Sequence, residues 1–460
     1  MLHALKNFFS SFKKNFQIDV YDQKKIVLSA CTFFFIIGAY SILRSLKTSI
    51  FLGFVGKEYL PIAKILSIVI MIPVMLLYSK LIDKLKRYQA VYFFLVLYAI
   101  LGIIFSYFFF HPVYGIKNTQ TSPYRILGWL FEFSMDMFQG MVVGTFWAFV
   151  NSISTPDFAS KNYGFIVAAS RIGGIITPLI SWFLLEQSGL ASWQSIPILT
   201  FFASLLLLAA SLFIRKLIYS IPESHLHGYQ AAYEANQAEE HSRKKPGIFE
   251  GLKLLLTEPY VLGIFGLVYS FEIISIIFDY QMQVLMSLET NNNVHAMSSF
   301  MFIYTGTFQA LSFFFAIFGT SHLLKRIGLQ KCLLIMPIVS ILLTIVLMVH
   351  QKLITVFVIM VILRALNYGF NHPIREILYI PTVKDIQFKS KAWIDSFGRT
   401  LSKTSGSAVN MFAIFQNSSL CLAIESACSI GVAGVWIMIA FFVGKTYMNT
   451  VKANKVIGRK

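Results

Sequence analysis

Charged side chains are scarce in this chain, and acidic side chains are the scarcest. Only 13% of the 460 residues are charged, and 21 acidic residues stand against 39 basic ones. Hydrophobic residues make up 56% of the chain, which includes 45 phenylalanines. Since an ordinary soluble domain has about 25% charged residues, this composition excludes that class of protein.

Cysteine is also rare, and no catalytic or phosphate-binding motif is present. The four cysteines lie inside apolar segments without ligand-like spacing: Cys31, Cys332, Cys421 and Cys428. We therefore expect neither a disulfide nor a metal site. No Walker-type glycine-rich loop occurs, which excludes ATP hydrolysis as the energy source. No nucleophile–base pair or metal set emerges either, so we predict no enzyme activity and no cofactor.

Long apolar runs are what the chain has instead. Runs of about 20 apolar residues recur, the length that a helix needs to cross a bilayer, and β-type alternation is rare. The sequence thus predicts an all-α polytopic membrane protein with about 12 transmembrane helices. The expected spans are 26–52, 60–81, 89–110, 124–151, 160–185, 195–215, 259–287, 297–320, 331–350, 353–376, 390–416 and 420–444.

Basic residues are distributed unevenly between the two sides of these spans. The termini and the segments 79–90, 152–161, 215–258, 321–331 and 375–391 hold 28 of the 39, whereas the opposite loops hold four. The positive-inside rule then places both termini in the cytoplasm. It also accounts for much of the net charge of +18 without a nucleic-acid partner. Because neither a signal peptide nor a transit extension precedes the first span, we expect a bacterial inner membrane.

The longest loop divides the spans six and six. We expect an N-terminal half at 1–216, a cytoplasmic linker at 217–258, a C-terminal half at 259–445 and a basic cytoplasmic tail at 446–460. This layout resembles that of major facilitator transporters, whose two halves are repeats. A weak internal repeat at an offset of 228 residues pairs Arg171 with Arg399 and fits the pseudo-symmetric 6+6 arrangement.

Seven basic residues remain inside the spans. If all seven faced lipid, the cost would be about 20 kcal/mol, which exceeds typical protein stability. They must therefore face protein, water or a ligand, or lie near an interface. In a major facilitator fold, spans one, four, seven and ten and the adjoining spans two, five, eight and eleven border the central cavity, and all seven basic residues fall on this set. They are Arg44, Lys47, Lys64, Arg171, Arg364, Arg399 and Lys403.

Acidic residues share the cavity-lining helices but are fewer. They are Glu132, Asp136, Glu272, Asp279 and Asp395. The excess of cations makes such a cavity attractive to an anion, and arginine offers paired donors to a phosphate or carboxylate. Other interpretations stay open: Arg44 and Lys47 at an interface, Lys64 and Arg364 as partners of buried acids, and Arg171 and Arg399 in interhelical ion pairs used for gating.

Three segments resemble the ATP/ADP translocase, or nucleotide transporter, family of intracellular bacteria and plastids. They are "ILRSLKTS" at 42–49, "FWAFVNSISTPDFASKNYGFIVAASRIGGIITPLIS" at 146–181 and "PIREILYIPTVKDIQFKSKAWIDSFGRTLSKTSGSA" at 373–408. The resemblance implies a major-facilitator-like carrier that exchanges or imports nucleotides. It also implies that a lysine in span one and another in span eleven contact the phosphates. These correspond to Lys47 and Lys403.

The chain departs from the family pattern at acidic positions. Ser45 and Thr48 stand where the family has acids beside its first lysine. The family also has glutamates in spans four and seven. Asp136 is the nearest counterpart of the first, and Glu272 and Asp279 both qualify as the second. The substrate therefore stays open between ATP and ADP, another nucleotide, NAD, and another phosphorylated or anionic metabolite.

We predict a secondary transporter for a phosphorylated anion, most readily a nucleotide, that works as a monomer by alternating access. The expected substrate-binding residues are Lys47, Arg44, Arg171, Arg399, Lys403, Asp136 and Glu272, and the expected coupling or gating residues are Asp279, Asp395, Arg364 and Glu132. Two alternatives stay open. One is a proton-coupled carrier of a small non-nucleotide solute, and the other is a membrane interaction or lipid-handling protein with structural ion pairs.

Overall fold

Helices make up most of the chain in the computed structural model. The structure describes residues 20–82, 85, 87–154, 156–222, 250–315, 320–379, 381–382, 386, 390–414, 418–453 and 455–458. Within these ranges twelve helical spans follow one another and no strand forms. Nine of them are long and apolar enough to cross a membrane by length and composition. The predicted all-α fold with about twelve spans is confirmed.

The spans have the following bounds. The first six are α2 (Val20–Phe54), α3 (Leu60–Ile82), α4 (Arg87–Phe110), α5–η2–α6 (Ile126–Phe138, Gln139–Val143, Gly144–Ser152), α7 (Pro156–Gln187) and α8 (Ser192–Ser220). The next six are α12 (Pro259–Glu289), α13 (Val294–Phe314), α14 (Thr320–Val349), α15–η4–α16 (Leu353–Leu366, Asn367–Asn371, His372–Ile377), α17–η6–α18 (Lys391–Trp393, Ile394–Gly398, Arg399–Ile414) and α19 (Ser418–Lys452). Two short helices, η1 (Lys57–Tyr59) and α11 (Glu250–Thr257), precede α3 and α12.

Several helices extend beyond the apolar runs. α2 begins at Val20 where the hydropathy predicts 26, and α19 continues to Lys452 where it predicts 444. Lysine and glutamine are good helix formers, so helical turns continue past the length that crosses a bilayer. Residues 223–249 of the expected linker lie outside the described residues, and the division into two halves stays a prediction.

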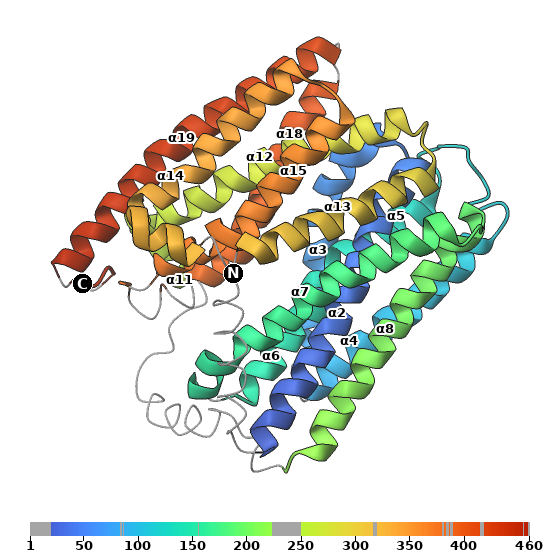
Figure 1. Ribbon diagram of the computed structural model, residues 1–460, viewed down its shortest axis with the longest axis horizontal. Coiled ribbons are helices and arrows are strands. Elements are labelled where there is room, and N and C mark those ends of the chain that lie inside the picture. Colours follow the sequence, from blue (N-terminus) through green and yellow to red (C-terminus); the bar gives the residue numbers. More distant parts are fainter. Residues whose placement is uncertain are drawn as a thin grey trace. The chain divides into compact units, whose positions relative to one another are not determined.

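The first compact unit combines Met1–Leu46, Val74–Lys117 and Ser134–Arg243. Within it, α4 and α8 lie side by side (Figure 1). Ser106 Oγ on α4 donates to the Pro197 carbonyl on α8 at 2.8 Å. On α7, Thr177 Oγ1 donates to the Gly38 carbonyl on α2 at 2.9 Å. Small and hydroxyl-bearing residues thus let these helices approach closely, as is usual in membranes.

The second compact unit combines Lys47–Pro73, Asn118–Phe133 and Lys244–Lys460. In this unit α14 and α19 lie side by side (Figure 1), and α12 packs against α15, α18 and α19. The unit also contains the C-terminal end of α2, the first half of α3 and the start of α5. Parts of the first six spans therefore pack together with the last six.

A tight contact within the second unit joins the end of α2 to the start of α13. Gly56 has a φ of +111°, which helical residues do not adopt, and α2 ends just before it. Asn293 caps α13 by accepting a hydrogen bond from the His295 amide at 2.9 Å. A Cβ atom at Gly53 would lie 2.3 Å from Val294 Cγ2. Only glycine allows this approach.

Arg125 anchors the loop that leads into α5. Its guanidinium lies 3.5 Å above the Phe54 ring and donates to the carbonyls of Asn118 at 2.9 Å and Gln120 at 3.1 Å. Burial lowers the pKa of Arg125 to about 10, so the side chain stays charged at neutral pH. The cation is stabilised by the ring and by two backbone dipoles.

A π-helical turn occurs within each of spans four, ten and eleven. η2 interrupts span four, η4 interrupts span ten and η6 interrupts span eleven. Spans four, ten and eleven therefore share an α–π–α pattern, whereas span five is the continuous helix α7. π-Helical turns often occur at functional sites, and here Arg364 lies just before η4 and Arg399 directly follows η6.

Candidate functional site

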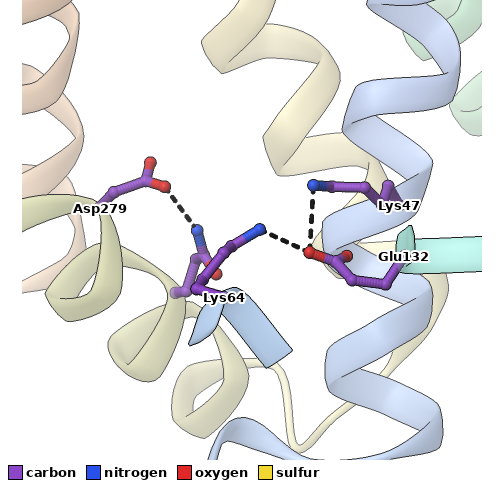
Figure 2. Close-up of polar contacts among 5 residues, drawn as sticks. Lys47, Lys64, Glu132 and Asp279 are labelled. Carbon is purple, nitrogen blue, oxygen red and sulfur yellow. Dashed lines mark hydrogen bonds and ion pairs between the residues drawn. The ribbon is translucent and has the colours of Figure 1, made fainter. Parts of the chain in front are cut away.

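Two lysines from different helices pair with one glutamate on a third helix. Lys47 Nζ on α2 lies 3.1 Å from Glu132 Oε1 on α5, and Lys64 Nζ on α3 lies 2.5 Å from the same oxygen. Figure 2 shows the two ammonium groups converging on Glu132. We call these three residues the Lys–Glu–Lys cluster; all of them belong to the second unit.

The cluster is buried and carries a net positive charge. The side chain of Glu132 is 1% exposed, that of Lys47 10% and that of Lys64 23%. Charge-assisted hydrogen bonds of this kind are about twice as strong as neutral ones, and they compensate the cost of burying the carboxylate. Glu132 Oε2 has no hydrogen-bond partner in the structure. Two cations on one anion leave a positive charge that a phosphate could bind.

A second ion pair lies on α12 and α15. Arg364 Nη2 is 3.8 Å from Asp279 Oδ1, and Gln283 Nε2 donates to Asp279 Oδ2 at 2.9 Å. Arg364 is buried, and its Nε atom makes no hydrogen bond. Asp279 therefore balances an arginine near the middle of the predicted bilayer segment.

A small cavity is lined by Lys64 of the Lys–Glu–Lys cluster and by Asp279 of this ion pair. It has a volume of about 20 Å³, which is room for a single water molecule. Its lining comes from α3, α12 and α18: Leu60, Pro61, Lys64, Ile276, Asp279, Tyr280, Gln283, Ser407 and Asn410. This space within the second unit is too small to admit a nucleotide.

A third group of charges lies at the π-helical turns of spans ten and eleven. Arg399 Nη2 on α18 is 3.4 Å from Asp395 Oδ1 on η6. Arg375 on α16 is 5% exposed and lies within electrostatic range of Arg399, Asp395 and Glu272. Its Nη1 atom makes no hydrogen bond. The buried guanidinium of Arg375 and the half-buried one of Arg399 have the paired donors that suit an anion.

Sequence reasoning missed Arg375. The expected span 353–376 and the basic segment 375–391 overlap at Arg375, which was counted with the loops; the structure places it on α16, which ends at Ile377. Its spacing of eleven residues from Arg364 would be about three turns of a continuous α-helix, but η4 lies between the two residues and breaks that periodicity. The π-helical turn between them was not visible in the apolar pattern.

Several of the predicted residues form ion pairs with one another. Lys47 pairs with Glu132, Arg364 with Asp279, and Arg399 with Asp395. Glu272 is buried on α12, and Lys403 is exposed on α18. Three half-buried residues belong to the first unit: Arg44 on α2, Asp136 on α5 and Arg171 on α7. Among the described residues no cluster of three His, Cys, Asp or Glu side chains could hold a metal.

Comparison with known proteins identifies related transporters. Residues 3–447 match the model of the family described as TLC ATP/ADP transporter. The chain is 23% identical over 465 residues to ADP,ATP carrier protein 1 of Rickettsia bellii, covering 89% of this chain and 90% of that protein. It is 22% identical over 455 residues to ADP,ATP carrier protein 1 of Rickettsia prowazekii, covering 88% and 89%.

Solved transporter structures share the fold. A D-xylose-proton symporter matches with a TM-score of 0.62 at 16% identity, covering 92% of this chain and 98% of the symporter. The xylose transporter XylE from E. coli matches with a TM-score of 0.58 at 13% identity, covering 89% and 94%. At these identities the likeness concerns the fold alone, which is the major-facilitator-like fold predicted from the sequence.

Proposed function

Because the chain belongs to the TLC ATP/ADP transporter family, we propose that it carries a nucleotide across a bacterial inner membrane. The observation that supports this most directly is the buried Lys–Glu–Lys cluster with its excess positive charge. Lys47 is also the residue that the family resemblance aligns with a phosphate-contacting lysine. The two Rickettsia relatives are named as carriers of ADP and ATP, which favours a nucleotide over other anions.

In the proposed site the basic residues bind the substrate, and the acidic residues balance charge or take part in gating. Phosphates are bound by Lys47 and Arg44 from span one, by Arg171 from span five, and by Arg399 and Lys403 from span eleven. Asp136 and Glu272 act as counter-charges. The ion pairs of Asp279 with Arg364 and of Asp395 with Arg399 open and close with the transport cycle. Binding energy that differs between two conformations is what shifts the population from one to the other.

Orientation and mechanism follow from the charge distribution. Both termini lie in the cytoplasm, since 28 of 39 basic residues fall on that side. The closed contact of α2 with α13 then lies at the outer surface, because α2 starts from the cytoplasmic N-terminus and crosses once. The transporter works as a monomer, by alternating access of two halves, and exchanges or imports its substrate.

Uptake into liposomes tests the proposal. Purified protein is reconstituted into vesicles that contain ADP, and entry of radiolabelled ATP is measured over time. We expect saturable uptake that Lys47→Gln and Lys403→Gln each lower at least tenfold, because each loses a phosphate contact. Lys331→Gln is the matched control, since Lys331 is exposed on α14. Its rate should equal that of the wild type.

Two results would overturn the proposal. One is transport of an uncharged solute that needs neither Lys47 nor Lys403. The other is uptake driven by an imposed proton gradient alone, unaffected by any nucleotide, which would favour the proton-coupled carrier of a small solute.

A further inference from the structure

Lys64 is a charged residue to which the family resemblance assigns no role. It lies on α3, and its ammonium is closer to Glu132 Oε1 than that of Lys47 is, at 2.5 Å against 3.1 Å. Figure 2 shows that the two lysines reach the carboxylate from different helices. One acid is therefore shared by two cations, although one cation would balance its charge.

The redundancy matters when Lys47 binds a phosphate. A phosphate held next to the Glu132 carboxylate would be repelled by it, so Lys47 has to turn away from Glu132, which is 1% exposed. A buried carboxylate left without a cation costs several kcal/mol, and this cost would be subtracted from the binding energy of the substrate. If Lys64 stays on Glu132, the carboxylate remains paired and the cost is avoided.

We propose that Lys64 is a positioning residue that holds Glu132 while Lys47 turns from Glu132 to a phosphate of the substrate. The proposal rests on the proposed function and deepens it, because it says why the site contains a second lysine. Lys64 does not touch the substrate. It acts by keeping the negative charge of Glu132 away from the phosphate and by freeing Lys47.

The surroundings of Lys64 fit this role. Its side chain is more exposed than that of Lys47, 23% against 10%, and it lines the cavity that has room for one water. Asp279 and Gln283 line the same cavity. An ammonium has three donors. Lys64 can therefore stay paired with Glu132 and also donate hydrogen bonds to water or to oxygens that line the cavity when Lys47 moves.

The kinetics of four variants test the proposal in the liposome assay. In Lys64→Gln, Lys47 becomes the only cation on Glu132 and is held there. We expect KM for the nucleotide to rise about tenfold, which is about 1.4 kcal/mol, with a smaller change in kcat. Lys64→Arg keeps a cation and should keep KM within about twofold of the wild type. Lys331→Gln is the control for loss of a lysine.

The double variant Lys64→Gln with Glu132→Gln gives the decisive comparison. It removes the carboxylate that holds Lys47, so KM should return to within about threefold of the wild-type value. If Lys64 contacts the phosphate itself, the double variant stays as impaired as Lys64→Gln, and the proposal is overturned. Unchanged KM in Lys64→Gln also overturns it. Should Lys64→Gln not fold, the double variant and Lys64→Arg still decide, since both must keep KM.

Failure of the proposed function gives a different result. In that case wild-type protein takes up no nucleotide. If the wild type transports nucleotide and only the Lys64 variants depart from expectation, the proposed function is retained and the role proposed for Lys64 is refuted.

Discussion

Two buried glutamates show how much the neighbours of a residue decide. Glu132 and Glu425 are both 1% exposed. Glu132 accepts two lysines, whereas Glu425 on α19 accepts the Gln281 amide from α12 and leaves Oε1 without a partner. Among the residues that the structure describes, no lysine or arginine forms an ion pair with Glu425. Since an unpaired buried carboxylate is very costly, we expect Glu425 to take up a proton, whereas the charge of Glu132 is balanced by its two lysines.

The same substitution at both positions should therefore have opposite results. Glu132→Gln removes the carboxylate that Lys47 and Lys64 share and should lower the free energy of unfolding by about 3 kcal/mol. Glu425→Gln replaces a neutral carboxyl by a neutral amide and should change it by less than about 1 kcal/mol. Denaturant unfolding of the detergent-solubilised protein measures both, with Glu186→Gln, exposed on α7, as control. Equal losses at the two sites would contradict this assignment of charge.

At the scale of elements, the end of α2 is held against the start of α13 by small side chains. Ser49 Oγ and Ser298 Oγ are 2.7 Å apart, and Gly53 has no side chain to separate the helices. Close approach of helices at small residues is the main source of packing energy in a membrane. The contact lies within the second unit and keeps this end of the bundle closed.

A methyl group at Gly53 should open that contact. Its Cβ would lie 2.3 Å from Val294 Cγ2 and 3.3 Å from the Asn292 carbonyl. We expect Gly53→Ala to lower stability by about 1–3 kcal/mol through overpacking. Adding Val294→Ala removes the clashing methyl groups and should restore most of the loss. Gly434→Ala is the control, because nothing lies within 4 Å of a Cβ atom there. Thermal unfolding in detergent measures the series, and a double variant no better than Gly53→Ala would refute the clash.

At the scale of the whole molecule, the charge distribution is the argument for orientation. The four basic residues of the opposite loops are Lys57, Lys117, Arg125 and Lys352. The Arg125 guanidinium stacks on the Phe54 ring and donates to two backbone carbonyls, so its charge stabilises the loop. In the expected topology the remaining basic residues outside the spans gather on one side, as anionic lipids and the insertion machinery favour.

Labelling of single cysteines tests this orientation. In a chain whose four native cysteines are replaced, Tyr124→Cys lies in an exposed loop and Ser242→Cys lies in the expected linker. A membrane-impermeant maleimide added to intact cells should label the first and not the second, and disruption of the cells should expose the second. The reverse pattern would place the termini outside.

The sequence by itself determined the class of protein, the number of spans and the set of charged residues that need a partner. Apolar runs of membrane length leave the backbone no other choice than helices, and their order matches the structure from α2 to α19. Lys47, Arg364 and Arg399 could be selected because a charge inside an apolar run must be compensated.

Only the tertiary structure decided which charge compensates which. The cluster at Glu132 joins three helices, and spacing along one helix cannot reveal such a partner. The π-helical turns also changed the faces that Arg375 and Arg399 present, because an extra residue per turn rotates every later side chain. Periodicity fixes where a chain crosses the bilayer, while the packing of one helix on another fixes which buried charges meet.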